Sequence, residues 1–153
     1  LAIGTIPASA PFREMPLAVL PVWAYVAAGH PWAAAGSVAL DDLLDEPLIL
    51  LPPAFTARQA LNAVLSDKAY ESPIEAANGT VAQALAAAGR GIAIASDDPR
   101  FGLIPLAIDL GDRHLSIRLR AVWDSRHPAA VTIARFADRL GHFIRDRYDA
   151  PKI

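Results

Sequence analysis

The sequence contains no cysteine, and this absence excludes several kinds of chemistry. Thiolate catalysis, disulfide bonds and zinc sites built from cysteine all need a side chain that is missing here. The absence also agrees with a reducing compartment, where disulfides are rare.

Long apolar runs are missing as well. A membrane-spanning helix needs roughly 18 or more consecutive apolar residues. The stretch that comes closest, residues 17–29, is shorter and contains Pro21, so we interpret it as a buried strand. No stretch resembles a signal peptide. We therefore expect a cytoplasmic location and no membrane partner.

Neither sign of charge dominates the chain. Fourteen basic and sixteen acidic residues give a net charge of −2, without a run of Lys or Arg. Proteins grip nucleic-acid phosphates with a basic patch or stripe. By itself this chain is therefore a poor candidate for binding nucleic acid.

What is present is a mainly apolar chain of 153 residues, 54% apolar and 20% charged. This composition is typical of globular proteins, and the length suits one domain or two small lobes. The first residues, LAIGT, already lie in an apolar, strand-like run. We therefore expect that the full protein has further residues upstream.

Apolar periodicity predicts strands that alternate with helices. Strands are expected at residues 1–4, 19–28, 48–51, 73–77, 92–95, 103–110 and 114–124, and helices at 38–45, 55–69, 80–88 and 129–148. The first strand is expected to be buried, and residues 5–16, rich in proline and small residues, to form a loop. Turn residues at 111–112 make an antiparallel pairing of the last two strands possible. The order of elements favours an α/β fold with a mainly parallel sheet.

The same periodicity predicts which helix faces are buried. The residues expected to be buried are Leu61, Val64, Leu65 and Ala69 in the second helix, Val81, Ala84, Leu85 and Ala88 in the third, and Ile133, Phe136, Ala137, Leu140 and Ile144 in the last.

The Gly89-Arg90-Gly91 triplet has the glycine content of a phosphate-binding loop, but it lies at the wrong end of the helix. Such a loop follows a strand and precedes a helix, whereas these glycines follow a helix and precede the strand IAIA. We interpret Gly89 as the left-handed residue that ends the helix. A nucleotide site is not expected here.

Two helix starts carry the spacing of a capping box, Thr56 with Gln59 and Thr80 with Gln83. Free N–H groups and a partial positive charge at a helix start suit a small anion. In an open α/β sheet, ligands lie beyond the carboxyl ends of the strands. The alternative is that both threonines only cap their helices. Phe55 is either a lid over a pocket or plain packing.

Catalytic and metal-binding patterns are weak. The four histidines have no metal-ligand spacing, so we expect no metal and no cofactor. Asp124, Ser125 and His127 have the residue types of a hydrolase triad, but they lie too close in sequence to converge from separate segments, which predicts a polar turn. Carboxylate pairs such as Asp97-Asp98 are interpreted as solvated surface. No enzyme is expected.

Several motifs occur together in one order: LAIG, then PLAVLPVWAYVAAGHPWA, then VALDDLLDEPLILLP, then TVAQALAAAGRGIAIAS. In this order and spacing they resemble the effector-binding domain of LysR-type transcriptional regulators. The most characteristic parts are residues 30–33, 40–43 and 87–92.

The resemblance implies a type 2 periplasmic-binding-protein-like fold, with two α/β lobes and a small-molecule effector in the cleft. Residues 1–21 and 121–153 would belong to the first lobe, which is incomplete in this chain, and residues 22–120 would form the second. The family's N-terminal winged helix-turn-helix, which binds DNA, is absent from this chain. The segment 97–103 is also shorter than is common in the family.

Carried over by position, the family's pocket residues include those at the two helix starts. The positions are Thr5, Pro53, Ala54, Phe55, Thr56, Gly79, Thr80 and Val81. Asn78 is added because it lies in the strand-to-helix loop before Gly79. Many members have a cationic or strongly polar residue where this chain has Thr5. An acidic effector would therefore depend more on the helix starts.

The function that the resemblance implies is sensing of a small polar or anionic molecule. The bound effector would control DNA binding by the absent N-terminal domain, through dimer or tetramer contacts. An alternative is the solute-binding protein of a transporter, which shares the fold. An enzyme comes third, because it would need acid and base residues that converge on the cleft.

Overall fold

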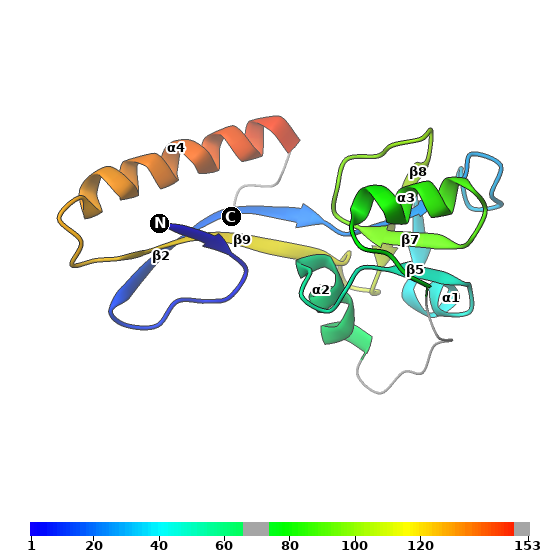
Figure 1. Cartoon of the computed structure of the whole chain (residues 1–153), viewed down its shortest axis with the longest axis horizontal. Coiled ribbons are helices and arrows are strands. Elements are labelled where there is room, and N and C mark those ends of the chain that lie inside the picture. The colour runs from blue at the N-terminus through cyan, green and yellow to red at the C-terminus, as the bar shows by residue number, and fades with distance from the viewer. Residues whose placement is uncertain (66–73, 149–153) are drawn as a thin grey trace. The chain divides into compact units, whose positions relative to one another are not determined.

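The computed structural model describes residues 1–65 and 74–148, which form two compact units. Residues 1–20 and the chain from residue 117 onward make up the first unit, and residues 21–116 make up the second. The chain passes from one unit to the other twice, once after Leu20 and once after Ser116. Figure 1 shows the elements in chain order by colour.

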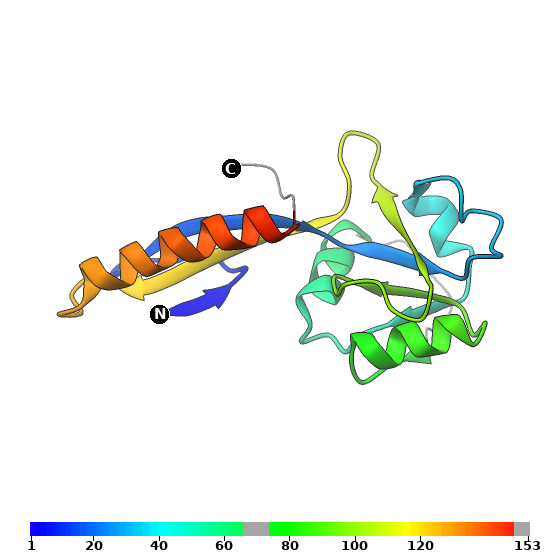
Figure 2. The same ribbon diagram turned by 90° about the horizontal axis from the view of Figure 1, so that it is seen from above.

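The first unit is a three-stranded sheet covered by a long helix. The strand order is β1 (Ala2–Gly4), β9 (Ser116–Asp124), β2 (Phe12–Pro21), and the helix is α4 (Ala130–Tyr148). In Figures 1 and 2, α4 runs along β2 and β9 in both views. Leu17, Ala121, Trp123 and Ala137 form the core between them. The predicted alternation along β9 places the last three of its apolar residues toward this helix and is confirmed.

Three expectations for the first unit are wrong. β1 is not buried, since Ala2 and Ile3 are exposed on a strand that ends the sheet. The expected loop 5–16 is strand from Phe12 onward, because an edge strand tolerates the proline at 16. Phe136 is 56% exposed instead of buried. The periodic pattern predicts that both Phe136 and Ala137 face the sheet, but of these two only Ala137 packs against it.

The second unit contains a six-stranded, mainly parallel sheet. Its order is β4 (Ser37–Ala39), β8 (Ile104–Asp109), β3 (Trp23–Val26), β7 (Ile92–Ala95), β5 (Leu48–Leu50), β6 (Ile74–Glu75). β3 is antiparallel to both of its neighbours, while β4 is parallel to β8, and β5 is parallel to β6 and β7. The other five strands therefore all point the same way and end at one edge.

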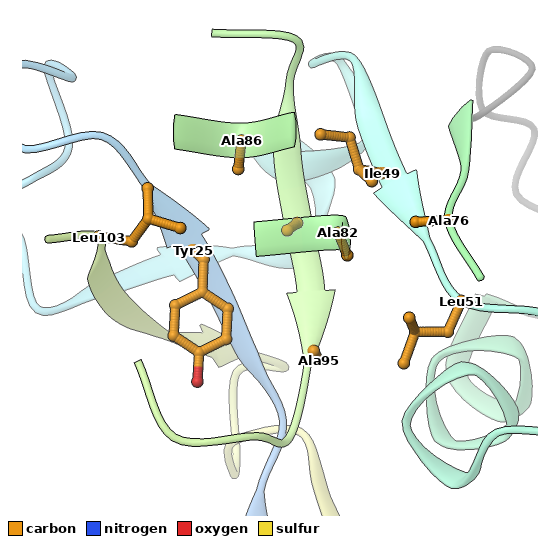
Figure 3. Close-up of a cluster of buried hydrophobic side chains, with 9 residues drawn as sticks. Tyr25, Ile49, Leu51, Ala76, Ala82, Ala86, Ala95 and Leu103 are labelled. Atoms are coloured by element: carbon orange, nitrogen blue, oxygen red, sulfur yellow. The ribbon is translucent and has the colours of Figure 1, made fainter. Parts of the chain in front are cut away.

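Three helices accompany this sheet: α1 (Leu40–Leu44), α2 (Thr56–Leu65) and α3 (Gly79–Ala87). α3 packs across β3, β7 and β5. Ala82 and Ala86 of α3 lie against Tyr25, Ile49 and the alanines of β7, in the cluster that Figure 3 shows. The small alanine side chains let the helix approach the sheet closely.

Several predictions for the second unit differ from the structure. α3 buries Gly79, Ala82, Gln83 and Ala86, not the predicted face, of which Val81 is 41% exposed. An alanine-rich helix is apolar on nearly every face, so the periodicity of its apolar residues does not identify the buried face.

The strands of this unit also differ from the prediction. β4 was not predicted, and the expected strand 19–28 is divided between the end of β2 and β3. β8 and β9 belong to different sheets, and the antiparallel pairing that the turn residues made possible is limited to a bridge between Asp109 and His114. Ala69 and Pro73 lie outside the described residues.

Candidate functional site at the carboxyl edge of the second unit

The parallel strands β5, β6 and β7 end side by side, and the loops that follow them meet there. We call this surface the carboxyl edge; it consists of residues 51–56, 76–81 and 96–100. Eight of the nine predicted effector positions lie in the first two of these segments. Thr5 follows β1 in the first unit and is half-buried there.

The start of α2 differs from the prediction. Thr56 is the first helical residue, and the carbonyl of Phe55 before it accepts the N–H of Gln59 at 2.9 Å. Phe55 therefore occupies the capping position expected for Thr56. The loop turns tightly, because the N–H of Phe55 donates to the Pro52 carbonyl at 3.0 Å. The Phe55 ring is 39% exposed, and the guanidinium of Arg58 donates to the Leu51 carbonyl at 3.4 Å.

The start of α3 is capped by Asn78, not by Thr80. The Asn78 side-chain oxygen accepts the N–H of Val81 at 3.0 Å, and its backbone is extended, as an N-cap requires. The predicted capping-box partner, Gln83, is fully buried and bonds elsewhere. Thr80 is exposed in the first turn. The predicted capping box of Thr80 and Gln83 is therefore wrong, and the helix begins two residues earlier than that pattern implies.

Asp97, directly after β7, lies against the first turn of α3. A Cβ added to the buried Gly79 would lie 2.0 Å from one Asp97 carboxylate oxygen, so a side chain at position 79 would require this carboxylate to move. Asp97 is exposed, as the interpretation of the Asp97-Asp98 pair as solvated surface predicts, but its contact with Gly79 was not predicted. In an open α/β sheet, ligands lie beyond the carboxyl ends of the strands. This strand-end rule was applied to the two preceding strands, and applied to β7 as well it would have pointed to Asp97.

Two buried polar side chains hold the segment after β7 in place. The phenol of Tyr25 donates to the Asp97 carbonyl. Gln83 donates to the Asp98 carbonyl at 3.1 Å and accepts the N–H of Arg100 at 2.7 Å. Burial raises the pKa of the Tyr25 phenol, and the nearby Asp97 and Asp98 charges raise it further, so Tyr25 remains a donor. The sequence analysis identified neither residue as a partner of this loop.

A hollow of about 510 Å³ lies where β4 and β8 end, on the far side of β3 from these loops. Residues 39–41 and 109–113 line it, together with Ala63 and Val64 of α2. Among the described residues, its charged lining consists of Asp41, Asp109, Asp112 and Arg113, and Arg113 forms an exposed ion pair with Asp112 at 3.4 Å. The acidic groups outnumber the basic one.

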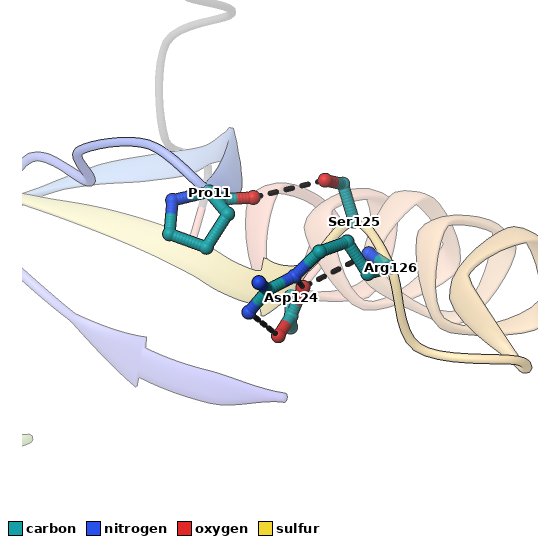
Figure 4. A network of polar contacts seen from close by, with 4 residues as sticks. All are labelled: Pro11, Asp124, Ser125 and Arg126. Carbon is teal, nitrogen blue, oxygen red and sulfur yellow. Dashed lines mark hydrogen bonds and ion pairs between the residues drawn. The ribbon is translucent and has the colours of Figure 1, made fainter.

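The residues with triad chemistry form a polar turn after β9, as predicted. Asp124 binds the guanidinium of Arg126 at 2.8 Å, and the Ser125 hydroxyl donates to the Pro11 carbonyl at 2.9 Å (Figure 4). His127 Nδ1 accepts the N–H of Ala129 at 3.1 Å. Each group is engaged with its own partner, so they do not form a nucleophile, base and orienting acid.

Replacing Arg126 with methionine is expected to return the pKa of Asp124 from about 2 toward its ordinary value of 3.8, because the hydrogen bonds from Arg126 lower it. A lowered pKa means that the pair stabilises the fold above about pH 3.8, and that this contribution disappears as the pH falls through about 2. NMR titration of the carboxyl carbon measures the change. Arg113→Met is the control and should leave Asp124 unmoved. An unchanged Asp124 midpoint in Arg126→Met would contradict the assignment.

Among residues 1–65 and 74–148, no group of three or more His, Asp or Glu side chains is placed to hold a metal ion. In the same residues, no helix is both long enough and apolar enough to cross a membrane.

Comparison with known proteins identifies the family. The model described as "LysR substrate binding domain" matches residues 1–144. The chain belongs to this family. A comparison with curated protein sequences finds no match.

Solved structures share the fold of this LysR substrate-binding domain at low sequence identity. The OxyR regulatory domain from Pseudomonas aeruginosa, in its reduced form, has a TM-score of 0.74 at 20% identity, covering 92% of this chain and 71% of that one. The Synechocystis PCC6803 CcmR regulatory domain in complex with 2-PG has a TM-score of 0.71 at 19% identity, with the same coverage. The BenM effector binding domain with its effector benzoate has a TM-score of 0.72 at 20% identity, covering 99% of this chain and 71% of that one.

The fold is therefore type 2 periplasmic-binding-protein-like, as the resemblance implied. The family is one of effector-binding regulatory domains of transcription regulators, and this is the function of the chain. The comparisons favour this function over a transporter's solute-binding protein. Families of this kind are regulatory and not typically enzymatic.

Proposed function

We propose that this LysR substrate-binding domain senses a small effector at its carboxyl edge and thereby controls DNA binding by another domain of the full-length regulator. The observation that carries the proposal is the meeting of three loops at one edge of a parallel sheet, in a chain that belongs to this family. Ligands of open α/β sheets lie at such edges.

The proposed effector contacts are the loop residues that the resemblance assigned, together with Asn78 from the same strand-to-helix loop. They are Pro53, Ala54, Phe55, Thr56, Asn78, Gly79, Thr80 and Val81, with Thr5 from the first unit. The related CcmR and BenM domains were each solved with a small molecule bound, which supports a ligand of that size. We also retain the lobe boundaries of the family as a proposal, with residues 22–120 as the second lobe.

In the proposed mechanism the effector shifts a population of states and no bond is made or broken. An effector that binds one state of the regulator more tightly than another moves the equilibrium by that difference in affinity. Dimer or tetramer contacts pass the shift to the DNA-binding domains. The mechanism needs no metal, cofactor or catalytic group. It places the protein in the cytoplasm, where the DNA is. With no cysteine, this chain cannot respond through its own thiol chemistry.

The test is a mobility-shift and footprinting experiment with the purified full-length regulator on DNA upstream of its own gene. The full-length protein should protect a defined site as an oligomer. The present chain alone should leave the DNA unshifted, because its net charge is −2 and it has no basic run. Absence of any protected site with the full-length protein would contradict the proposal.

A further inference from the structure

The start of α3 is already occupied by a negative charge of the same chain. We propose that Asp97 is a specificity-determining residue that excludes acidic effectors from this end of the carboxyl edge and selects neutral or cationic ones. This inference rests on the proposed function, and it replaces the sequence-based expectation that an anion would lie beside Thr80.

The contact between Asp97 and α3 is close. Measured from an ideal Cβ on Gly79, the Asp97 carboxylate has one oxygen at 2.0 Å, its carbon at 2.6 Å and the other oxygen at 3.1 Å. The carboxylate therefore covers the Gly79 Cα in the first turn, where a helix carries its partial positive charge. Asn78 satisfies the N–H of Val81 in the same turn. An incoming anion would therefore find one N–H of this turn already paired and a carboxylate of the same chain beside it.

The backbone of Asp97 and of the residues that follow it is held by two buried side chains, which keeps the exposed Asp97 side chain beside the start of α3. Tyr25, fully buried in β3, donates its hydroxyl to the Asp97 carbonyl. Gln83, fully buried in α3, bonds to the Asp98 carbonyl and the Arg100 N–H, at 3.1 and 2.7 Å. Moving the segment would leave these buried groups without partners, which is costly.

Charge then decides which ligands suit this end of the edge. An effector carboxylate beside Gly79 would meet the Asp97 carboxylate, and like charges at close range oppose binding. An ammonium, amidinium or neutral donor group would instead gain a charged acceptor. Beyond β3, the described residues that line the hollow at the same edge include three aspartates and one arginine.

The experiment uses two probes of the same shape and opposite charge, benzamidine and benzoate, titrated into the isotope-labelled chain. Benzamidine should shift the amide signals of Gly79, Thr80 and Asp97 at concentrations about tenfold or more below those needed for benzoate. Asp97→Asn should reduce or reverse this preference by about the same factor. Asp45→Asn removes the same charge at an exposed position before β5, at the other edge of the sheet, and should leave the preference unchanged.

Equal or stronger shifts with benzoate in the wild-type chain would overturn the proposal. So would an unchanged preference in Asp97→Asn, or no shift of these amides with either probe. Asp97→Ser serves if the asparagine variant does not fold. The DNA-binding test is independent of this one: a missing footprint would refute the regulatory role, whereas a benzoate preference would refute only the role of Asp97.

Discussion

Gly91→Ala is expected to lower the free energy of unfolding by about 3 kcal/mol or more, from backbone strain and a steric clash together. Gly91 has a φ of +143°, which a residue with a side chain rarely adopts. A Cβ there would lie 2.4 Å from the Pro47 carbonyl oxygen, which is backbone and cannot rotate away. The same oxygen accepts the Ile92 N–H at 2.8 Å. The substitution therefore disturbs the point where β7 starts beside β5.

The matched control is Gly89→Ala, two residues earlier. Gly89 also has a positive φ, +73°, but nothing lies within 4 Å of an added Cβ. It should cost only about 1 kcal/mol, the ordinary cost of a left-handed alanine. Urea unfolding followed by circular dichroism gives both values. Equal losses in the two variants would show that the Pro47 clash does not contribute.

Gln83→Leu is expected to cost about 2–4 kcal/mol, although leucine has nearly the same size and is more apolar. The substitution removes both partners that Gln83 provides to the backbone, at Asp98 and at Arg100. Gln83 is fully buried, so water cannot replace the lost bonds where the side chain lies. Backbone groups left without partners destabilise the folded state by their full desolvation cost.

Gln59→Leu provides the comparison for Gln83, because Gln59 is exposed in α2 and its side chain makes a long contact of 3.4 Å to the Ala54 carbonyl. Its effect should stay within about 0.5 kcal/mol. Hydrogen exchange adds a local readout: the Arg100 amide should exchange faster in Gln83→Leu and not in Gln59→Leu. If Arg100 keeps its protection, Gln83 does not hold this segment.

Much of the fold was predictable because its strands are short apolar runs bounded by proline or glycine. The strands at Leu48–Leu50, Ile92–Ala95 and Ile104–Asp109 lie within or coincide with the predicted ranges. Gly89 adopts the left-handed conformation expected of a residue that ends a helix. These features depend on local preferences, which act within a few residues of each other.

Which side of an element is buried was less predictable. In α3, alanines surround the helix, and the buried face is the one that carries the polar Gln83. In α4, Phe136 and Ala137 are neighbours, yet the smaller residue packs on the sheet and the larger one is exposed. Burial depends on which neighbouring element covers a face, and this is a property of the tertiary structure.

The candidate site, too, could be predicted from the sequence only in part. The loops after β5 and β6 could be located from the sequence, because the strand-end rule needs only the order of elements. The third loop, with Asp97, was interpreted as surface because an aspartate pair after a strand is usually solvated. Its contact with Gly79 joins residues 18 positions apart, and no local pattern indicates it.

By itself, the sequence determined the α/β class, the order of the helices and of the strands from residue 48 onward, the exclusion of thiol chemistry and the family. All of these depend on composition or on the order of motifs along the chain. Only the tertiary structure decided that Asn78 caps α3, that Tyr25 and Gln83 hold the segment after β7, and that Asp97 lies at the helix start. The physical reason is distance along the chain: contacts between Tyr25 and Asp97 exist only once β3 and β7 have paired.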